Sequence, residues 1–392
     1  MSHVGAAVRL GCERLFDDDS VALVRGRRVG LVTNHSGIDS HLRSTADRLH
    51  VTDGIELSLL FGPEHGIRGD SEDGVTVDTG CDARTGVPTV SLYGERREPA
   101  PDELAGLDVL LYDIQDVGVR FYTYLYTMSL TMVACAQAGV PFVVLDRPNP
   151  LGGVDIEGNI LDPDFASFVG LYPIPVRYGL TIGELARLFN TEFGIDVDLH
   201  VVDMQGWRRT MHWQETGLPW VAPSPNMPTP DTANVYPGMC FFEGTNVSEG
   251  RGTTHPFEQV GAPYIDGFEL ADGLDALALP GAGFRPVLFR PAFGKHEGQT
   301  CHGVQLHTTP GADFQPVRVG FTALAAVRRG WPDDFTWRAN QEGIHNFDKL
   351  AGTDLVRLAI DDGVAIDDLL AEWAVERAAF EDARQKYLRY PF

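Results

Sequence analysis

Six short apolar segments, separated by helix-like stretches, constrain the fold of this chain more than any other feature. They cover residues 29–33, 55–61, 89–93, 109–112, 141–145 and, more weakly, 199–202. The stretches 122–138 and 182–193 between them have helical periodicity, and Thr181 and Glu184 have the spacing of a capping box. Continuous apolar strands that alternate with helices are typical of a parallel sheet covered on both faces. The sequence therefore predicts an α/β fold with a Rossmann-like, doubly wound parallel sheet.

The length of the chain predicts a second domain, because 392 residues exceed one ordinary core. Prolines gather in residues 214–240, a composition that favours an extended, rigid crossing between domains. Mixed strand and helix patterns follow, at 285–290, 303–307, 317–329 and, as one long helix, 366–387. We therefore predict a Rossmann-like domain over 1–213 and a smaller mixed α/β domain over 214–392 that begins with the Pro-rich crossing.

The charge of the chain limits its partners. The formal net charge is -24, from 55 acidic and 31 basic residues, and nucleic acids and anionic membranes both attract basic surfaces. The N-terminus lacks the apolar core of a signal peptide, and no segment approaches the ~20 apolar residues of a membrane span. We expect a cytoplasmic protein that acts on a small molecule, with export not excluded and the oligomeric state open.

Motifs for cofactors and metals are missing from the sequence. No GxGxxG follows the first strand, and GxxxxGK[ST] does not occur. The cysteines are too far apart for a CxxC motif. We therefore predict no cofactor and no bound metal.

Polar residues follow the predicted strands directly. In chain order they include Asn34, His35, Glu64, His65, Gln115 and Asp116. The carboxyl ends of parallel strands meet at one edge, where open α/β folds bind ligands. The sequence therefore predicts a cleft lined by these side chains.

Glu64, in the segment FGPEHGIRGD, is the leading candidate for a general acid. The strand before it is a stiff mount, and the neighbouring glycines let a ligand approach the backbone. A carboxyl group at a partly closed rim can hold its proton near neutral pH. The alternatives are a helix cap or an ion pair with Arg68, and His65 is expected to orient a ligand by hydrogen bonding.

Two other segments predict ligand contacts. Residues 241–263 combine glycines with hydrogen-bonding side chains between apolar anchors, which favours a loop around a polar ligand. Its candidate site residues are Glu243, Asn246, Glu249 and Arg251. In RFYTYLYT, Tyr122 is the candidate platform for a sugar ring, although aromatic residues more often belong to a core.

Several long segments of the chain resemble the DUF1343 family, the NamZ-like exo-β-N-acetylmuramidases. They are LVTNHSG, LFGPEHGIRGD, GVPTVSLYG, LYDIQDVGVRFYTY, FVVLDRPNPLGG, SPNMPTPDTANVYPG and FFEGTNVSEGRGTTHPFEQVGAPYID. The resemblance implies a cleft between a Rossmann-like domain and a smaller α/β domain. It also implies release of N-acetylmuramic acid from the non-reducing end of peptidoglycan fragments, with Glu64 as the catalytic carboxyl.

Three questions remain open at this level. The first is the identity of the second carboxylate, for which the candidates are Asp116 and Glu243 and, ranked below them, Glu249. The distance between this carboxylate and the acid distinguishes retention from inversion of configuration at the anomeric carbon. The substrate's own acetamido group can also replace a protein nucleophile, with Asp116 orienting it. Two other classes of protein also stay open. One is a metal-assisted amidase or esterase that uses His35, His65 and Asp70 or Asp116, and the other is a non-catalytic muropeptide-binding protein.

The lactyl carboxylate of N-acetylmuramic acid requires a cationic partner in any site that demands it. Arginine suits this role through its planar pair of donors. The arginines in the candidate segments are Arg68, Arg120, Arg147 and Arg251, of which Arg68 and Arg251 are the preferred pair.

Overall fold

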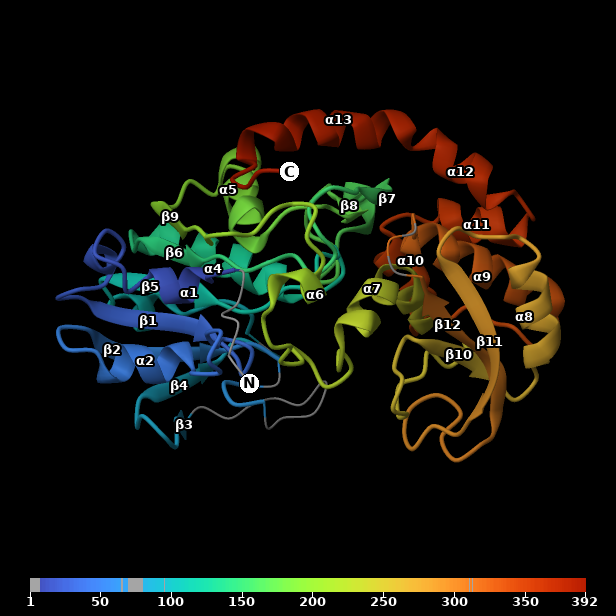
Figure 1. The fold of residues 1–392 in the computed structure, drawn as a ribbon, viewed down its shortest axis with the longest axis horizontal. Coiled ribbons are helices and arrows are strands. Elements are labelled where there is room, and N and C mark those ends of the chain that lie inside the picture. Colours follow the sequence, from blue (N-terminus) through green and yellow to red (C-terminus); the bar gives the residue numbers. More distant parts are fainter. Residues whose placement is uncertain (1–7, 65, 70–79, 95, 310, 312) are drawn as a thin grey trace.

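The protein has two α/β parts that lie side by side beneath an arch of C-terminal helices (Figure 1). The structure is a computed structural model that describes residues 8–64, 66–69, 80–94, 96–309, 311 and 313–392. No helix in these ranges is both long and apolar enough to cross a membrane.

A seven-stranded sheet forms the N-terminal part, in the order β3-β4-β2-β1-β5-β6-β9. Its strands are β1 (Arg28–Thr33), β2 (Glu56–Gly62), β3 (Gly80–Cys81), β4 (Pro88–Ser91), β5 (Val109–Asp113), β6 (Phe142–Leu145) and β9 (Leu199–Val202). All neighbours pair in parallel except β3 and β4. The predicted strands are all present, and the doubly wound α/β fold is confirmed.

Helices cover both faces of this sheet. They are α1 (Gly11–Arg14), α2 (Thr45–Val51), α3 (Pro101–Leu104), α4 (Tyr124–Ala138) and α5 (Ile182–Glu192). Successive strand residues point to opposite faces, so Val143 joins one hydrophobic core and Val144 the other. The predicted capping box is confirmed, because Thr181 Oγ1 accepts from the Glu184 amide at 3.2 Å and Glu184 Oε2 accepts from the Thr181 amide at 3.0 Å.

The C-terminal part is built on an antiparallel sheet in the order β10-β12-β11. Its strands are β10 (Gln259–Ala262), β11 (Ala282–Phe289) and β12 (Cys301–Thr308), and its helices include α7 (Pro230–Met239), α8 (Gly267–Asp275), α9 (Pro316–Gly330), α10 (Asn346–Ala351) and α11 (Leu355–Asp361). A small antiparallel pair, β7 (Glu157–Ile160) and β8 (Pro175–Arg177), lies between the two parts in Figure 1. This second mixed α/β unit was predicted.

The prediction of one long helix over residues 366–387 is wrong, because the helix is interrupted at Trp373. The chain forms α12 (Ile366–Glu372) and α13 (Ala374–Arg384), with Trp373 between them at φ -87° and ψ 1°. Trp373 is buried and packs edge-on against Phe321 of α9, with ring centroids 6.5 Å apart. The helical spacing of apolar residues continues across this junction, so the sequence gives no sign of the break.

The Pro-rich crossing is extended over only part of the predicted range. It begins with the short helix α6 (Trp213–Thr216), and α7 starts at Pro230 with Thr229 as its N-cap. Proline is well tolerated at the first helical position. The stretch between these helices lies over the carboxyl ends of β1 and β5, where the strand order reverses. Tyr124 Oη donates to the Pro223 carbonyl there at 2.8 Å.

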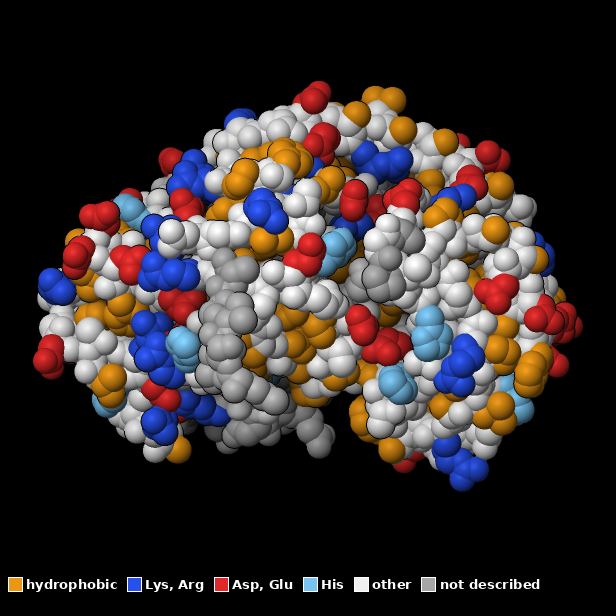
Figure 2. All heavy atoms as spheres, in the orientation of Figure 1, with side chains coloured by type: hydrophobic (Ala, Val, Ile, Leu, Met, Phe, Trp, Pro, Cys, Tyr) orange, Lys and Arg blue, Asp and Glu red, His pale blue; other side chains and the backbone are white. Residues whose placement is uncertain are grey.

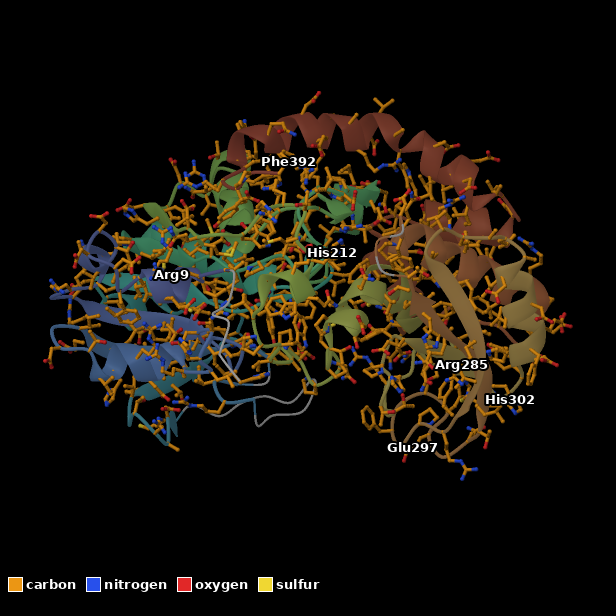
Figure 3. The ribbon with its side chains drawn as sticks, viewed as in Figure 1. Arg9, His212, Arg285, Glu297, His302 and Phe392 are labelled. Carbon is orange, nitrogen blue, oxygen red and sulfur yellow. The ribbon has the colours of Figure 1, made fainter. Side chains whose placement is uncertain are left out.

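The C-terminal tail returns to the N-terminal part. Figure 3 shows Phe392 beneath α13, beside α5. Tyr390 Oη donates to Asp146 Oδ2 at 2.5 Å and accepts from the Met204 amide at 3.0 Å. The predicted boundary between residues 213 and 214 stays a proposal.

Candidate active site

A cavity of about 650 Å³ lies between the two parts of the chain. Figure 2 shows the surface hollowed at its lower edge, between these parts. The lining residues are Glu64, Tyr93, Phe121, Tyr122, Thr123, Tyr124, Phe168, Val169, Ser224, Tyr236, Cys240, Glu243, Glu249, Arg251, Phe293, Gly294, Lys295, Arg338, Asn346, Lys349 and Leu350. Of the predicted site residues, the structure brings Glu64, Tyr122, Glu243, Glu249 and Arg251 together here.

Glu64 follows β2 in a tight turn. The Gly66 amide donates to the Pro63 carbonyl at 3.1 Å, and Gly66 has a φ of +71°, which favours glycine. The turn directs the chain away from the sheet, and the half-buried Glu64 lines the cavity. The predicted position at a strand end is therefore confirmed, whereas the catalytic role of Glu64 stays a prediction.

Aromatic rings form much of the wall beside Glu64. Tyr122 packs edge-on against Tyr124 and Tyr236, with ring centroids 5.1 and 6.0 Å away. Burial, followed by the charges of Tyr124, Asp116 and Glu64, raises the pKa of Tyr122 well above its usual value. The Tyr122 hydroxyl is buried and has no hydrogen-bond partner in the described part of the chain. Such a wall can hold the apolar face of a sugar ring.

Glu243 and Arg251 form an ion pair on the opposite wall. Glu243 Oε1 accepts from Arg251 Nε at 3.0 Å and from Arg251 Nη2 at 2.7 Å. Both side chains are 29% exposed, so each can contact a ligand. The guanidinium also lies 5.1 Å from the centre of the Phe257 ring, which restricts its orientation.

Glu249 and Lys295 form a second, more buried pair. Lys295 Nζ lies 2.7 Å from Glu249 Oε2 and donates to the carbonyls of Phe242 and Val247 at 2.7 and 2.9 Å. Burial lowers the pKa of Lys295, and the charge of Glu249 opposes this effect. Lys295 belongs to the loop between β11 and β12, in which Figure 3 labels Glu297 at the lower edge.

Arg338 and Lys349 also line the cavity, and the sequence reasoning missed both, together with Lys295. They lie outside every motif that predicted a site. One signal was present in the composition: the chain has only three lysines, and two of them, Lys295 and Lys349, lie at this cavity.

Asn34, His35 and Gln115 lie away from this cavity. Asn34 Nδ2 donates to the Pro223 carbonyl at 3.3 Å, and His35 Nε2 lies 2.6 Å from the Ala222 carbonyl. Gln115 Nε2 donates to the carbonyls of Asp116 and Pro148, both at 2.8 Å. The expectation that all the strand ends line one ligand cleft is therefore not met. The Pro-rich crossing covers the carboxyl ends of β1 and β5, where the strand order of the sheet reverses, and Asn34 and His35 bind the carbonyl groups of this crossing.

Arg68 lines a different cavity, also of about 650 Å³, together with Asn34 and His35. Arg68 Nε and Nη2 donate to Asp82 at 2.7 and 2.8 Å, and Nη2 donates to Asp47 at 2.8 Å. This pairing raises the pKa of Arg68. Its charge is therefore compensated by structural partners outside the Glu64 cavity.

The arginines Arg120 and Arg147 are structural. Arg147 Nε donates to Asp113 Oδ1 at 2.6 Å, and both side chains are buried. Arg120 is fully buried and donates only to backbone carbonyls. Of the candidate arginines, Arg251 alone lies in the cavity, where it binds Glu243.

Asp116 is buried behind the cavity and is absent from its lining. Asp116 Oδ2 accepts hydrogen bonds from the Tyr178 hydroxyl and, at 2.8 Å, from the Gly118 amide. Burial raises the pKa of Asp116 to about 6, against the effect of these donors. The contact with Tyr178 is a supporting one, so the geometry does not favour Asp116 as a group that touches substrate.

Asn246 is likewise absent from the cavity lining and holds a neighbouring segment. Its Nδ2 donates to the Asp334 carbonyl at 2.8 Å, and its Oδ1 accepts from the Thr336 amide at 3.0 Å and from the Tyr264 hydroxyl at 2.9 Å. These bonds fix the chain just before Arg338.

The metal-dependent alternative requires histidine and acidic side chains that converge. No group of three His, Cys, Asp or Glu side chains there could hold a metal ion. His65 and Asp70, which that alternative invoked, lie outside the described residues.

Comparisons with known proteins agree over nearly the whole chain. The family model described as "Exo-beta-N-acetylmuramidase NamZ, N-terminal" matches residues 29–231, and the corresponding C-terminal model matches residues 234–390. The chain is 48% identical over 383 residues to "Peptidoglycan beta-N-acetylmuramidase NamZ" of Bacillus subtilis, covering 98% of this chain and 91% of that protein.

Two crystal structures of DUF1343 family proteins from Bacteroides fragilis are similar to this fold. The first has a TM-score of 0.91 and 38% sequence identity, and the second has a TM-score of 0.77 and 30% identity. Each match covers 98% of this chain and 99% of the crystal structure's chain.

Proposed function

The chain belongs to the NamZ exo-β-N-acetylmuramidase family, and two similar solved structures are of DUF1343 family proteins. We propose that its interdomain cavity hydrolyses glycosidic bonds with Glu64 as general acid. The substrate is a peptidoglycan fragment, and the product is the N-acetylmuramic acid released from its non-reducing end. The position of Glu64 in the cavity, beside an aromatic wall, carries the proposal.

The reaction requires a proton on the leaving oxygen. The carboxyl group of Glu64 donates its proton to the glycosidic oxygen as the bond from that oxygen to the anomeric carbon breaks. The sugar becomes positively charged at the anomeric carbon and the ring oxygen, and a nearby carboxylate stabilises this charge. Water then adds to the anomeric carbon and supplies the hydroxyl group of the released sugar, and the proton that this water loses goes to a carboxylate of the cavity, so that Glu64 regains a proton before the next cycle.

The other two carboxyls of the cavity suit the opposite role. Glu243 is bound by Arg251, and Glu249 lies against Lys295. A neighbouring cation holds a carboxylate in position, and a carboxylate beside the anomeric carbon can stabilise the positive charge that forms there. We therefore propose Glu243, the more accessible of the two, as the second carboxylate, in place of Asp116.

The test is hydrolysis of a chromogenic β-N-acetylmuraminide and of its N-acetylglucosaminide analogue. The wild-type protein should release the chromophore from the muraminide and much less from the glucosaminide. Glu64→Gln should lower kcat by about 10² to 10⁴-fold, the usual contribution of a general acid. Glu56→Gln is the matched control, since exposed Glu56 lies at the other end of the same strand, and its kcat should not change.

Two outcomes would contradict the proposal. Near wild-type kcat in a folded Glu64→Gln variant would show that another group is the acid. Tight binding of the muraminide by the wild type without any turnover would instead identify a muropeptide receptor.

A further inference from the structure

We propose that Arg338 and Lys349 together bind the lactyl carboxylate of N-acetylmuramic acid and so select this sugar over N-acetylglucosamine. This inference rests on the proposed function and adds the residues that recognise the substrate. Neither residue lies in a segment that the sequence connected with a ligand.

The charges of the cavity distinguish these two cations from the others. Arg251 donates to Glu243, and Lys295 lies against Glu249 while it also donates to two carbonyls. The guanidinium of Arg338 and the ammonium of Lys349 have no hydrogen bond or ion pair with any residue in the described ranges. Two positive charges at the cavity are therefore available for an anionic ligand.

The backbone brings these two cations to the same wall. The Arg338 amide donates to the Gly244 carbonyl at 2.8 Å, and the Asn346 amide donates to the Arg338 carbonyl at 2.9 Å. Asn346 and Lys349 are three residues apart on α10, so their side chains share one face of the helix. Asn346 lines the cavity as well. The pairing therefore places the backbone of Arg338 beside the start of α10, and the side chains of Arg338 and Lys349 line the same cavity.

Two neighbours hold this wall in place. Asn246 fixes the segment before Arg338 through Asp334 and Thr336. Arg120 Nη2 donates to the carbonyls of Leu350 and Ala351, at the end of α10, at 3.3 and 2.5 Å. The cations are thus mounted on segments that are anchored to both parts of the protein, as a binding site requires.

The chemistry of the sugar matches this arrangement. N-acetylmuramic acid differs from N-acetylglucosamine by a lactyl ether that carries a carboxylate. A carboxylate that enters a cleft without a partner pays a desolvation cost, whereas an arginine and a lysine offer it charge-assisted hydrogen bonds. Arg68, Arg120 and Arg147 cannot supply these bonds because none of them lines the cavity and each already donates to other acceptors.

The test compares three chromogenic substrates: the β-N-acetylmuraminide, its lactyl methyl ester and the N-acetylglucosaminide. Arg338→Ala and Lys349→Ala should each lower kcat/KM on the muraminide by about 10-fold or more, mainly through KM, and the double variant by about 100-fold. On the uncharged methyl ester and the glucosaminide, the same variants should lose less than about 3-fold.

Matched controls are Arg329→Ala and Lys386→Ala, which replace exposed cations that do not line the cavity. They should leave all three activities unchanged, and thermal unfolding should show that every variant is folded. Equal losses on the charged and uncharged substrates, or no loss on the muraminide, would overturn the inference. Both results leave the proposed function intact, whereas failure of the wild type to cleave the muraminide would refute that function.

Discussion

Replacing Arg120 with methionine should loosen the contact between the two parts of the protein. Arg120 Nη1 donates to the carbonyls of Asn159 and Ile174 at 2.8 and 2.9 Å, and Nη2 donates to those of Leu350 and Ala351. Burial lowers the pKa of Arg120 to about 10, so the side chain is still charged at neutral pH. It therefore provides a cation at the negative end of α10.

The bonding pattern sets the size of the effect. Ile174 O also accepts from the Leu161 amide at 3.2 Å, and Ala351 O also accepts from Asn159 Nδ2 at 2.8 Å. At most two of the four carbonyls are then left bare, at about 1–3 kcal/mol each. Methionine avoids the desolvation of a cation, which offsets part of this cost. We therefore expect the free energy of unfolding of the Arg120→Met variant to fall by about 2–4 kcal/mol.

The assay is thermal unfolding followed by circular dichroism. An unfolding entropy of about 2.1 cal/mol/K per residue gives about 0.8 kcal/mol/K for 392 residues. The midpoint of the Arg120→Met variant should therefore fall by about 3–5 °C. Arg329→Met, at an exposed position at the end of α9, is the control and should not shift it. An Arg120→Met midpoint within about 1 °C of wild type would refute the argument.

Three further outcomes follow from the structure. Burial raises the pKa of Asp146 from 3.8 to about 7, so between these pH values the folded protein keeps a proton on Asp146 that the unfolded chain releases. The contribution of this group to stability is complete below about pH 4 and is lost as the pH rises through 7, so Asp146→Asn should flatten the profile of unfolding midpoint against pH in this range. Asn246→Ala frees the segment before Arg338 and should raise KM for the muraminide about 3- to 10-fold with little change in kcat, and an unchanged KM would argue against this positioning role. EDTA should leave activity unchanged, and a loss that Zn²⁺ restores would favour a metal-dependent enzyme.

Local pattern predicted the elements of the N-terminal part well. The apolar segments became the strands of the sheet, and the capping box at Thr181 starts α5 as expected. These features depend on how apolar and polar residues alternate over a short stretch of chain, and this alternation can be read from the sequence. The same reasoning failed at Trp373, where the helix is interrupted and the Trp373 side chain packs against Phe321. The helical spacing of apolar residues is the same on both sides of this position, so it does not reveal the interruption.

The candidate site was predicted in part. Glu64, Tyr122, Glu243, Glu249 and Arg251 reach one cavity. Asn34, His35 and Gln115 do not, although they also follow strands. Strand ends in a parallel sheet share an edge, but sequence cannot show that another segment of the same chain already covers part of that edge.

The sequence by itself determined the parallel sheet, the position of Glu64 at the end of a strand and the family of the chain, because each depends on neighbouring residues or on long matched segments. Tertiary structure alone decided which charges remain available in the cavity. Arg338 and Lys349 lie more than 270 residues from Glu64 along the chain, and only packing of the two parts brings them to the same cavity. Whether an arginine is available for a ligand depends on the acceptors that folding places around it, as the bonds of Arg68 and Arg120 demonstrate.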